Sequence, residues 1–232
     1  TFYTSNGTLK IEVYTPNVFR IRAVKDTFVK TFSYAVVASQ KKCKLTTAES
    51  DSLYTICTDS LCIKIQKYPV RLAIFNKTGQ LILGDDPSFG ISWLGEEVTA
   101  YKTLRPGERF IGLGEHTGNI DRRGEYFTNW NTDDPGYSNR NKSLYASIPF
   151  YIGLHDSLIY GIFLDNSSQT TFNFGAGNDR FVSFIVAVGA IFSTYVITWI
   201  MIGHNTKPVV FAMFPFVFLF MEKKSDFLVF QG

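Results

Sequence analysis

Residues 7–24 read GTLKIEVYTPNVFRIRAV, and apolar side chains alternate with polar ones in both halves of this stretch. Alternation with a period of two is typical of strands that bury one face. The segment Thr15-Pro16-Asn17 between the halves has the composition of a turn. The stretch therefore predicts a β-hairpin.

The same pattern returns in residues 61–83, LCIKIQKYPVRLAIFNKTGQLIL, with a break at Tyr68-Pro69 and a further turn at residues 76–79. Strands that recur about every ten residues are typical of a β-sandwich or a barrel. No long amphipathic helical pattern occurs before residue 180. The sequence therefore predicts an all-β fold.

The composition agrees with this fold class and excludes one class of partner. The 232 residues include 22 Phe and 12 Tyr, which favour strands. A hydrophobic content of 45% with 19% charged residues is enough for a packed core. The net charge is only +3, and Lys and Arg are spread along the chain, so we expect no nucleic-acid partner.

Residues 107–136 are rich in glycine and polar residues, which predicts short strands joined by shaped loops. Residues 130–137, WNTDDPGY, combine aromatic residues, an Asn, two adjacent acids and a Pro-Gly turn. Carboxylates and amides hydrogen-bond sugar hydroxyls, and aromatic faces stack on sugar rings. The pattern predicts a polyol-binding loop, with two solvated turn-forming acids as the alternative interpretation.

Other kinds of site find less support. GLGEHTG, residues 112–118, lacks the third glycine of a dinucleotide-binding loop. Glu115 and His116 are adjacent, which on a strand directs them to opposite faces rather than making an acid/base pair. The three histidines are far apart in the chain, and no G-x-S-x-G segment occurs. We therefore expect no catalytic residue, no metal site and no cofactor.

The cysteines and the glycosylation triplets leave the compartment open. Cys43, Cys57 and Cys62 are interpreted as small buried thiols, and a Cys57–Cys62 bridge is the alternative. The localisation is therefore left unassigned, with the cytoplasm slightly favoured and membrane association through the tail as the alternative. Four N-x-S/T triplets, which matter only in a secreted chain, begin at Asn6, Asn76, Asn141 and Asn166.

The C-terminal region differs from the rest. Residues 181–206 contain no Lys, Arg, Asp or Glu, a length that suits a transmembrane helix. The stretch is nevertheless rich in β-branched and aromatic residues, so we favour buried strands. A membrane segment within residues 184–221, with the membrane as a partner, is the alternative.

Two segments together resemble a known family. FIGLGEHTGNIDRRGEYFTNWNTDDPGY, residues 110–137, and LYASIPFYIGL, residues 144–154, resemble the N-terminal β-sandwich of glycoside hydrolase family 31, the α-glucosidase and α-xylosidase family. That sandwich is marked by GLGE-x-TG-x-x-x-RRG, WNTD-x-PGY and SIPF. The resemblance covers most of residues 1–184. It implies a galactose-mutarotase-like β-sandwich, or supersandwich, that precedes a (β/α)8 barrel.

The resemblance also implies roles for individual residues. In the family, the loop matching WNTD reaches over the barrel mouth, and its Asp helps to bind the sugar next to the cleavage point. By position this residue is Asp133, and the ligand is an α-glucoside or a related oligosaccharide. The other implied substrate-site residues, which shape the loop, are Trp130, Asn131 and Tyr137. The implied loop supports are Asp134 and, as braces for the acids, Arg122 and Arg123.

The catalytic pair of the family has no counterpart in this sequence. Retaining hydrolysis needs two carboxyl groups about 5 Å apart, which the barrel supplies in the family. No W-x-D-M-N-E-type segment occurs, and residues 185–232 are too few for a barrel, which needs about 250. The catalytic barrel is therefore expected as a partner that this chain lacks, and the chain alone is expected to be inactive.

The pattern of the family ends near Ser183. A truncated gene, a tail read in a wrong frame and an acquired membrane anchor are the three explanations. We accordingly predict a sandwich domain over residues 1–184 and a divergent hydrophobic tail over residues 185–232.

Two functions remain after these steps. The favoured one is an accessory, carbohydrate-binding N-terminal domain of an α-glucosidase-like hydrolase. The alternative is a free-standing carbohydrate-binding or mutarotase-like module, with or without a membrane anchor. Epimerisation needs a His and a Glu as acid and base, which three scattered histidines do not favour.

Overall fold

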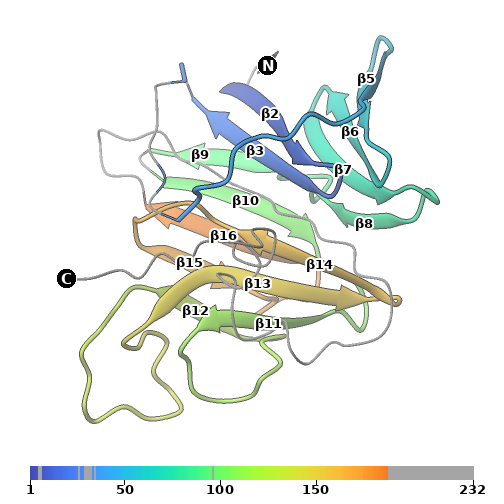
Figure 1. Ribbon diagram of the computed structural model, residues 1–232. Coiled ribbons are helices and arrows are strands. Elements are labelled where there is room, and N and C mark those ends of the chain that lie inside the picture. The colour runs from blue at the N-terminus through green and yellow to red at the C-terminus, as the bar shows by residue number, and fades with distance from the viewer. Residues whose placement is uncertain (5–6, 26, 29–32, 34, 96, 188–232) are drawn as a thin grey trace, which may run out of the picture.

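The computed structural model describes residues 1–4, 7–25, 27–28, 33, 35–95 and 97–187, and in these residues the regular structure consists of strands. Figure 1 shows them as layers of sheet joined by loops. The all-β prediction is confirmed.

The strands form four hydrogen-bonded sheets in the described residues. The first sheet contains β1 (Phe2–Thr4), β2 (Gly7–Thr15) and β3 (Val18–Val24). The second contains β4 (Thr46–Glu49), β5 (Leu53–Cys57), β6 (Leu61–Lys67), β7 (Val70–Asn76) and β8 (Leu81–Gly84). The central sheet has the order β12-β15-β16-β10-β9, with β9 (Ile91–Leu94), β10 (Glu97–Thr103), β12 (Tyr126–Asn129), β15 (Thr170–Asn173) and β16 (Phe181–Ala187). The small sheet has the order β11-β13-β14, with β11 (Arg109–Gly114), β13 (Ser147–His155) and β14 (Leu158–Phe163).

Both hairpins predicted from alternation are present. Strands β2 and β3 pair antiparallel, and Thr15 lies opposite Val18 at the predicted turn. Strands β6 and β7 pair antiparallel around the turn at the cis peptide bond between Tyr68 and Pro69. The alternation sets the buried face, because Leu61, Ile63 and Ile65 of β6 all lie in the core.

A layer of aromatic side chains joins the small sheet to the central sheet. Tyr151 of β13 is fully buried. Its ring centroid lies 5.1 Å from that of Phe174, just after β15, and 5.6 Å from that of Phe184 in β16 of the central sheet. It also lies 5.7 Å from Phe110 of β11. The contacts with Phe110 and Phe174 are edge-to-face, and the contact with Phe184 is tilted. Packing of this kind favours one fixed arrangement of the rings, and therefore of the two sheets.

Polar contacts join the second sheet to its neighbours. The Nζ of Lys102 in β10 donates to a carboxylate oxygen of Asp85, just after β8, and both side chains are buried. Asp85 also accepts from the backbone N–H of Leu72, at 2.8 Å. From the small sheet, Nε2 of His155 lies 2.7 Å from the carbonyl oxygen of Ile82.

The cysteines require a correction. Cys57 and Cys62 form a disulfide between neighbouring strands β5 and β6, while Cys43 is free. The favoured expectation of three thiols is therefore wrong, and the alternative bridge is present. The two cysteines are register partners across an antiparallel pair, which brings their side chains together.

The predicted tail begins inside a strand. β16 continues to Ala187, and it pairs with both β10 and β15 in the central sheet. The remaining tail residues, 188–232, and with them most of the proposed membrane segment, lie outside the described residues. In the part of the chain that is described, we find no helix of the length and apolar character needed to cross a membrane.

We expect Tyr151→Ala to lower the free energy of unfolding by about 3–5 kcal/mol, because it removes a fully buried ring and leaves a cavity between the two sheets. Tyr3→Ala is the matched control, since Tyr3 is 87% exposed and should change stability by less than about 0.5 kcal/mol. Urea unfolding of both variants measures the difference. Equal losses would contradict the assigned role of Tyr151.

Candidate functional site

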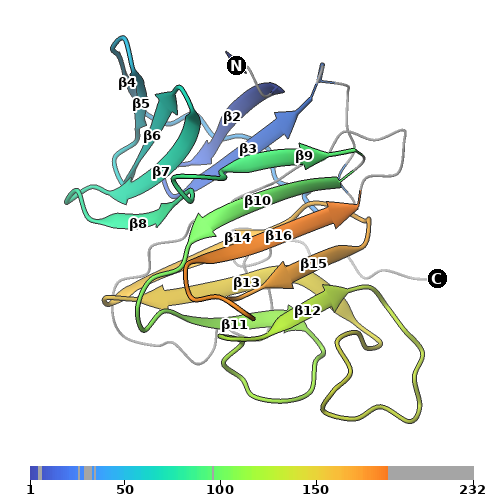
Figure 2. The same cartoon turned by 180° about the vertical axis from the view of Figure 1, so that it is seen from behind.

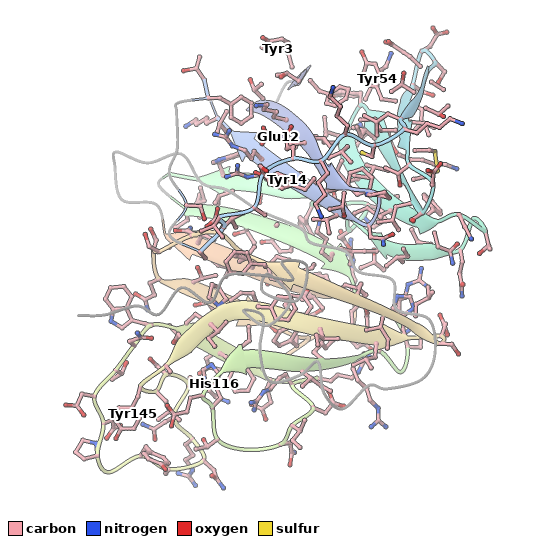
Figure 3. The ribbon with its side chains drawn as sticks, viewed as in Figure 1. Tyr3, Glu12, Tyr14, Tyr54, His116 and Tyr145 are labelled. Atoms are coloured by element: carbon pink, nitrogen blue, oxygen red, sulfur yellow. A yellow bond between two sulfur atoms is a disulfide. The ribbon has the colours of Figure 1, made fainter. Side chains whose placement is uncertain are left out.

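Two loops lie at one edge of the sandwich. One joins β11 to β12, and the other, residues 130–146, joins β12 to β13 (Figures 1 and 2). Figure 3 places His116 of the first loop and Tyr145 of the second in this region. Thr117 Oγ1 donates to the carbonyl oxygen of Ser138 at 3.2 Å, so the loops are in direct contact.

The glycines of the GLGE segment bring these loops together. The register of β11 with β13 shifts between Gly112 and Gly114, which have φ of 133° and 84°. A Cβ on Gly114 would lie 2.4 Å from the carbonyl oxygen of Ala146, so a side chain does not fit. The backbone N–H of Glu115 donates to the same oxygen at 2.8 Å. This bulge ties the start of the first loop to the end of the second.

Asp134 organises residues 130–146 from within. One of its carboxylate oxygens accepts from the Asn141 amide at 2.5 Å, and the other accepts from the backbone N–H of Gly136 at 3.2 Å. Its carbonyl oxygen accepts from the Tyr145 hydroxyl at 2.6 Å. The geometry of Asp134 is therefore that of a loop support, with both carboxylate oxygens occupied.

The neighbouring acid, Asp133, has a different environment from that of Asp134. Its side chain is exposed, and its carboxylate accepts no hydrogen bond from the described residues. Tyr137 and Tyr145 lie on the same loop with ring centroids 6.1 Å apart, in an edge-to-face arrangement. Partial burial raises the pKa of Tyr145, and the negative charges of Asp133 and Asp134 raise it further. Asp133, Tyr137 and Tyr145 thus make a cluster of one carboxylate and two hydroxyls.

Tyr145 was not among the residues expected from the sequence. It is 38% exposed and closes the same loop two residues before β13 begins. The signal that could have found it is its place in LYASIPF, one of the segments that carry the family resemblance.

Trp130 and Asn131 lie at a different part of the loop. Both line a pocket of about 330 Å³ that Asp133 and Tyr137 do not line. The Asn131 side-chain oxygen accepts from the backbone N–H of Ser147 at 2.8 Å, which fixes the start of the loop against β13. Trp130 is 53% exposed. Of the four expected substrate residues, Trp130 and Asn131 therefore line this pocket, whereas Asp133 and Tyr137 lie outside it.

The expected role of Arg122 and Arg123 as braces for the acids is wrong. Arg122 donates to the carbonyl oxygens of Thr117 and Asn119, at 3.2 and 2.8 Å. Arg123 donates to the carbonyl oxygens of residues 105 and 108, at 2.9 and 2.8 Å. Arg122 thus supports the loop that joins β11 to β12, and Arg123 supports the connection that precedes β11. The Nη1 atoms of both arginines donate to backbone carbonyl oxygens and not to a carboxylate.

His116 and Glu115 do not form an acid/base pair. Glu115 is exposed, whereas the His116 ring packs against Phe127 with centroids 4.8 Å apart. Burial of the ring, followed by the positive charge of Arg122, lowers the pKa of His116 to about 4. At neutral pH this imidazole is therefore uncharged and serves as part of the packing under the loop.

The chemistry available at this edge is binding by hydroxyl, amide and carboxylate groups. No group of three or more His, Cys, Asp or Glu is placed to hold a metal ion within the described ranges. The groups that are present can hydrogen-bond a polyol and pack against a sugar ring.

The fold and the loop-bearing edge define a β-sandwich domain of the galactose mutarotase type. Residues 8–173 match the family model described as the glycosyl hydrolase 31 N-terminal galactose mutarotase-like domain. The chain therefore belongs to glycoside hydrolase family 31, and the family expected from the motifs is confirmed.

Curated relatives agree with this assignment. Alpha-glucosidase 2 of Bacillus thermoamyloliquefaciens is 31% identical over 183 residues, which are 78% of this chain and 23% of that protein. The isomaltosyltransferase of Sporosarcina globispora is 24% identical over 175 residues, which are 71% of this chain and 16% of that protein. The chain thus spans less than a quarter of the length of these relatives.

Solved structures share the fold. The GH31 dextranase of Flavobacterium johnsoniae, complexed with glucose, matches with a TM-score of 0.77 and 33% identity over 87% of this chain and 24% of the dextranase. The cycloalternan-forming enzyme of Listeria monocytogenes, in complex with a pentasaccharide substrate, has a TM-score of 0.72 and 17% identity over 85% of this chain and 18% of the enzyme. At 17% identity, the match to the cycloalternan-forming enzyme shows a shared fold only.

His116 makes the stability of the protein depend on pH. Its pKa is lowered from 6.5 to about 4 in the folded state, so the unfolded chain binds a proton at higher pH than the folded chain does. The free energy of unfolding should therefore fall as the pH drops from about 6.5 to about 4, by at most about 1.4 kcal/mol per pH unit. Urea unfolding between pH 7 and pH 4 measures this slope. His116→Gln should flatten it, and an unchanged slope in that variant would assign the effect to other groups.

Proposed function

We propose that this chain is the N-terminal accessory domain of an α-glucosidase-like hydrolase and that Asp133 binds a sugar hydroxyl of the substrate. One observation carries the proposal, namely the different environments of two neighbouring acids. Both carboxylate oxygens of Asp134 are occupied within the loop, whereas Asp133 is exposed and accepts no hydrogen bond from the described residues. A carboxylate held on a braced loop is preorganised to accept hydrogen bonds from a ligand.

The surroundings of Asp133 suit a carbohydrate. Tyr137 and Tyr145 add two hydroxyl groups and two aromatic edges to the exposed end of the loop. Trp130 and Asn131 shape the start of the loop, where the Asn131 side chain is bonded to Ser147. The dextranase of F. johnsoniae was solved with glucose and with isomaltotriose, which supports an α-glucoside or a related oligosaccharide as the substrate class for this chain.

The catalytic groups are proposed to come from another part of the assembled enzyme. A one-sided loop encloses little of a sugar, whereas useful ligand sites enclose most of their ligand. The described residues present Asp133 on such a loop, so a second surface is needed to complete the site. A (β/α)8 catalytic barrel, the partner implied by the family, would supply that surface and the two catalytic carboxylates.

A mutarotase-like activity finds no support in the placement of the histidines. His116 is neutral and packs against Phe127, and His155 is bonded to the carbonyl oxygen of Ile82. The third, His204, lies outside the described residues.

The proposal can be tested in a chimera in which residues 130–146 of this chain replace the corresponding loop of the F. johnsoniae dextranase. We expect Asp133→Ala to lower kcat/KM for dextran about ten- to a hundredfold, because a hydrogen bond to a charged group is lost. Asp133→Asn should restore part of the loss, since the amide keeps one acceptor oxygen.

Arg140→Ala is the control, because Arg140 is an exposed residue of the same loop. It should leave kcat/KM unchanged. A chimera in which Asp133→Ala is as active as the parent would contradict the assigned role of Asp133.

A further inference from the structure

The pocket beside Trp130 is lined by residues of both the central sheet and the small sheet. The end of β12 and the starts of β13 and β15 lie at one end of the sandwich (Figure 1). Asn129 and Thr170 are register partners there. The pocket measures about 330 Å³, which falls at the lower end of the range for small-ligand sites. Its lining residues are Asn129, Trp130, Asn131, Ser147, Pro149, Asn166, Ser167, Ser168 and Thr170.

The charge of the lining limits the class of ligand. None of these lining residues is a Lys, Arg, His, Asp or Glu, so nothing in the lining compensates the charge of an anion or a cation. The desolvation of a charged ligand would therefore be uncompensated. A neutral ligand with several hydroxyl groups meets no such penalty.

The hydrogen bonds of two side-chain amides orient their donors. The Asn131 oxygen accepts from the backbone N–H of Ser147, and the Asn166 oxygen accepts from the backbone N–H of Ser168 at 2.7 Å. These bonds assign the oxygen and the nitrogen of each amide. Both amide nitrogens have no partner among the described residues and can donate to a ligand.

One further lining residue carries an unsatisfied polar atom. The Ser147 hydroxyl is buried without a hydrogen-bond partner in the described structure, whereas the Asn129 amide interacts with the His116 ring. Buried polar atoms are seldom left unsatisfied, because each costs free energy. A ligand hydroxyl in the pocket would offer the Ser147 hydroxyl a partner. Trp130, about half exposed, adds an indole ring of the kind that packs against the apolar face of a sugar.

We propose that this pocket binds a neutral sugar unit and that the Asn131 and Asn166 amides donate hydrogen bonds to it. The proposal goes beyond the role given to Asp133, because Asp133 does not line the pocket. With a single small pocket and neutral donors, the expected Kd is on the order of millimolar.

The test is a titration of the full 232-residue chain with isomaltotriose, followed by tryptophan fluorescence and by saturation-transfer NMR of the sugar. Ser167→Phe should weaken binding at least tenfold by filling the pocket. Gln169→Phe is the matched control, because it adds the same ring to an exposed residue of the same loop that does not line the pocket. It should bind like the parent chain.

Asn166→Asp provides a second variant that preserves the loop. It keeps an oxygen that accepts from Ser168 but replaces the donor nitrogen with a charged oxygen, in a lining that has no other charged side chain, so it should weaken binding about tenfold. Thermal unfolding of each variant verifies that the fold is intact. Arg140→Ala, at an exposed residue that does not line the pocket, should leave this binding unchanged.

Each outcome decides the proposal. Saturable binding that is lost in Ser167→Phe and Asn166→Asp, but kept in Gln169→Phe and Arg140→Ala, supports it. Absence of saturable binding overturns it and leaves the role of Asp133, which is measured in the dextranase chimera, unaffected. Binding that is lost in Asp133→Ala and kept in Ser167→Phe and Asn166→Asp overturns the pocket and supports the Asp133 loop.

Discussion

Tyr151 lies in the apolar layer between the small sheet and the central sheet, and its ring contacts Phe110 of the small sheet and Phe184 of the central sheet. The loops of the site connect strands of these two sheets, since β12 belongs to the central sheet and β11 and β13 to the small one. Their ends therefore keep a fixed separation only while the aromatic layer holds the sheets together. Close packing of the aromatic layer therefore fixes the positions of the strand ends that carry the exposed loop residues.

Short polar contacts complete this arrangement at the edge of the sandwich. The bulge at Gly112 and Gly114 places Glu115 beside Ala146, and Asp134 links the middle of the loop to Asn141 and Tyr145. These bonds satisfy backbone and side-chain groups locally, so the loop has a defined shape without a hydrophobic core of its own. Asp133 lies in the loop that these bonds hold in shape. Its side chain makes none of them and is exposed.

The strands were predictable because alternation depends only on neighbours in sequence, as β6 and the β2–β3 hairpin illustrate. The loop motif was predictable for the same reason. The partners of Arg122 and Arg123 were not, because a guanidinium donates equally well to a carboxylate or to a carbonyl, and only the folded chain shows which one lies within reach. The Cys57–Cys62 bridge likewise depended on the cross-strand register.

The sequence by itself determined the fold class, the family and the loop that bears the two acids, since each is encoded in local pattern and contiguous motif. Only the tertiary structure decided that Asp134 is bonded within the loop while Asp133 is exposed, and that Trp130 and Asn131 face a pocket with residues from the β14–β15 connection. The physical reason is that hydrogen-bond partners and pocket walls come from segments distant in sequence. Their positions are set by the packing of the two sheets.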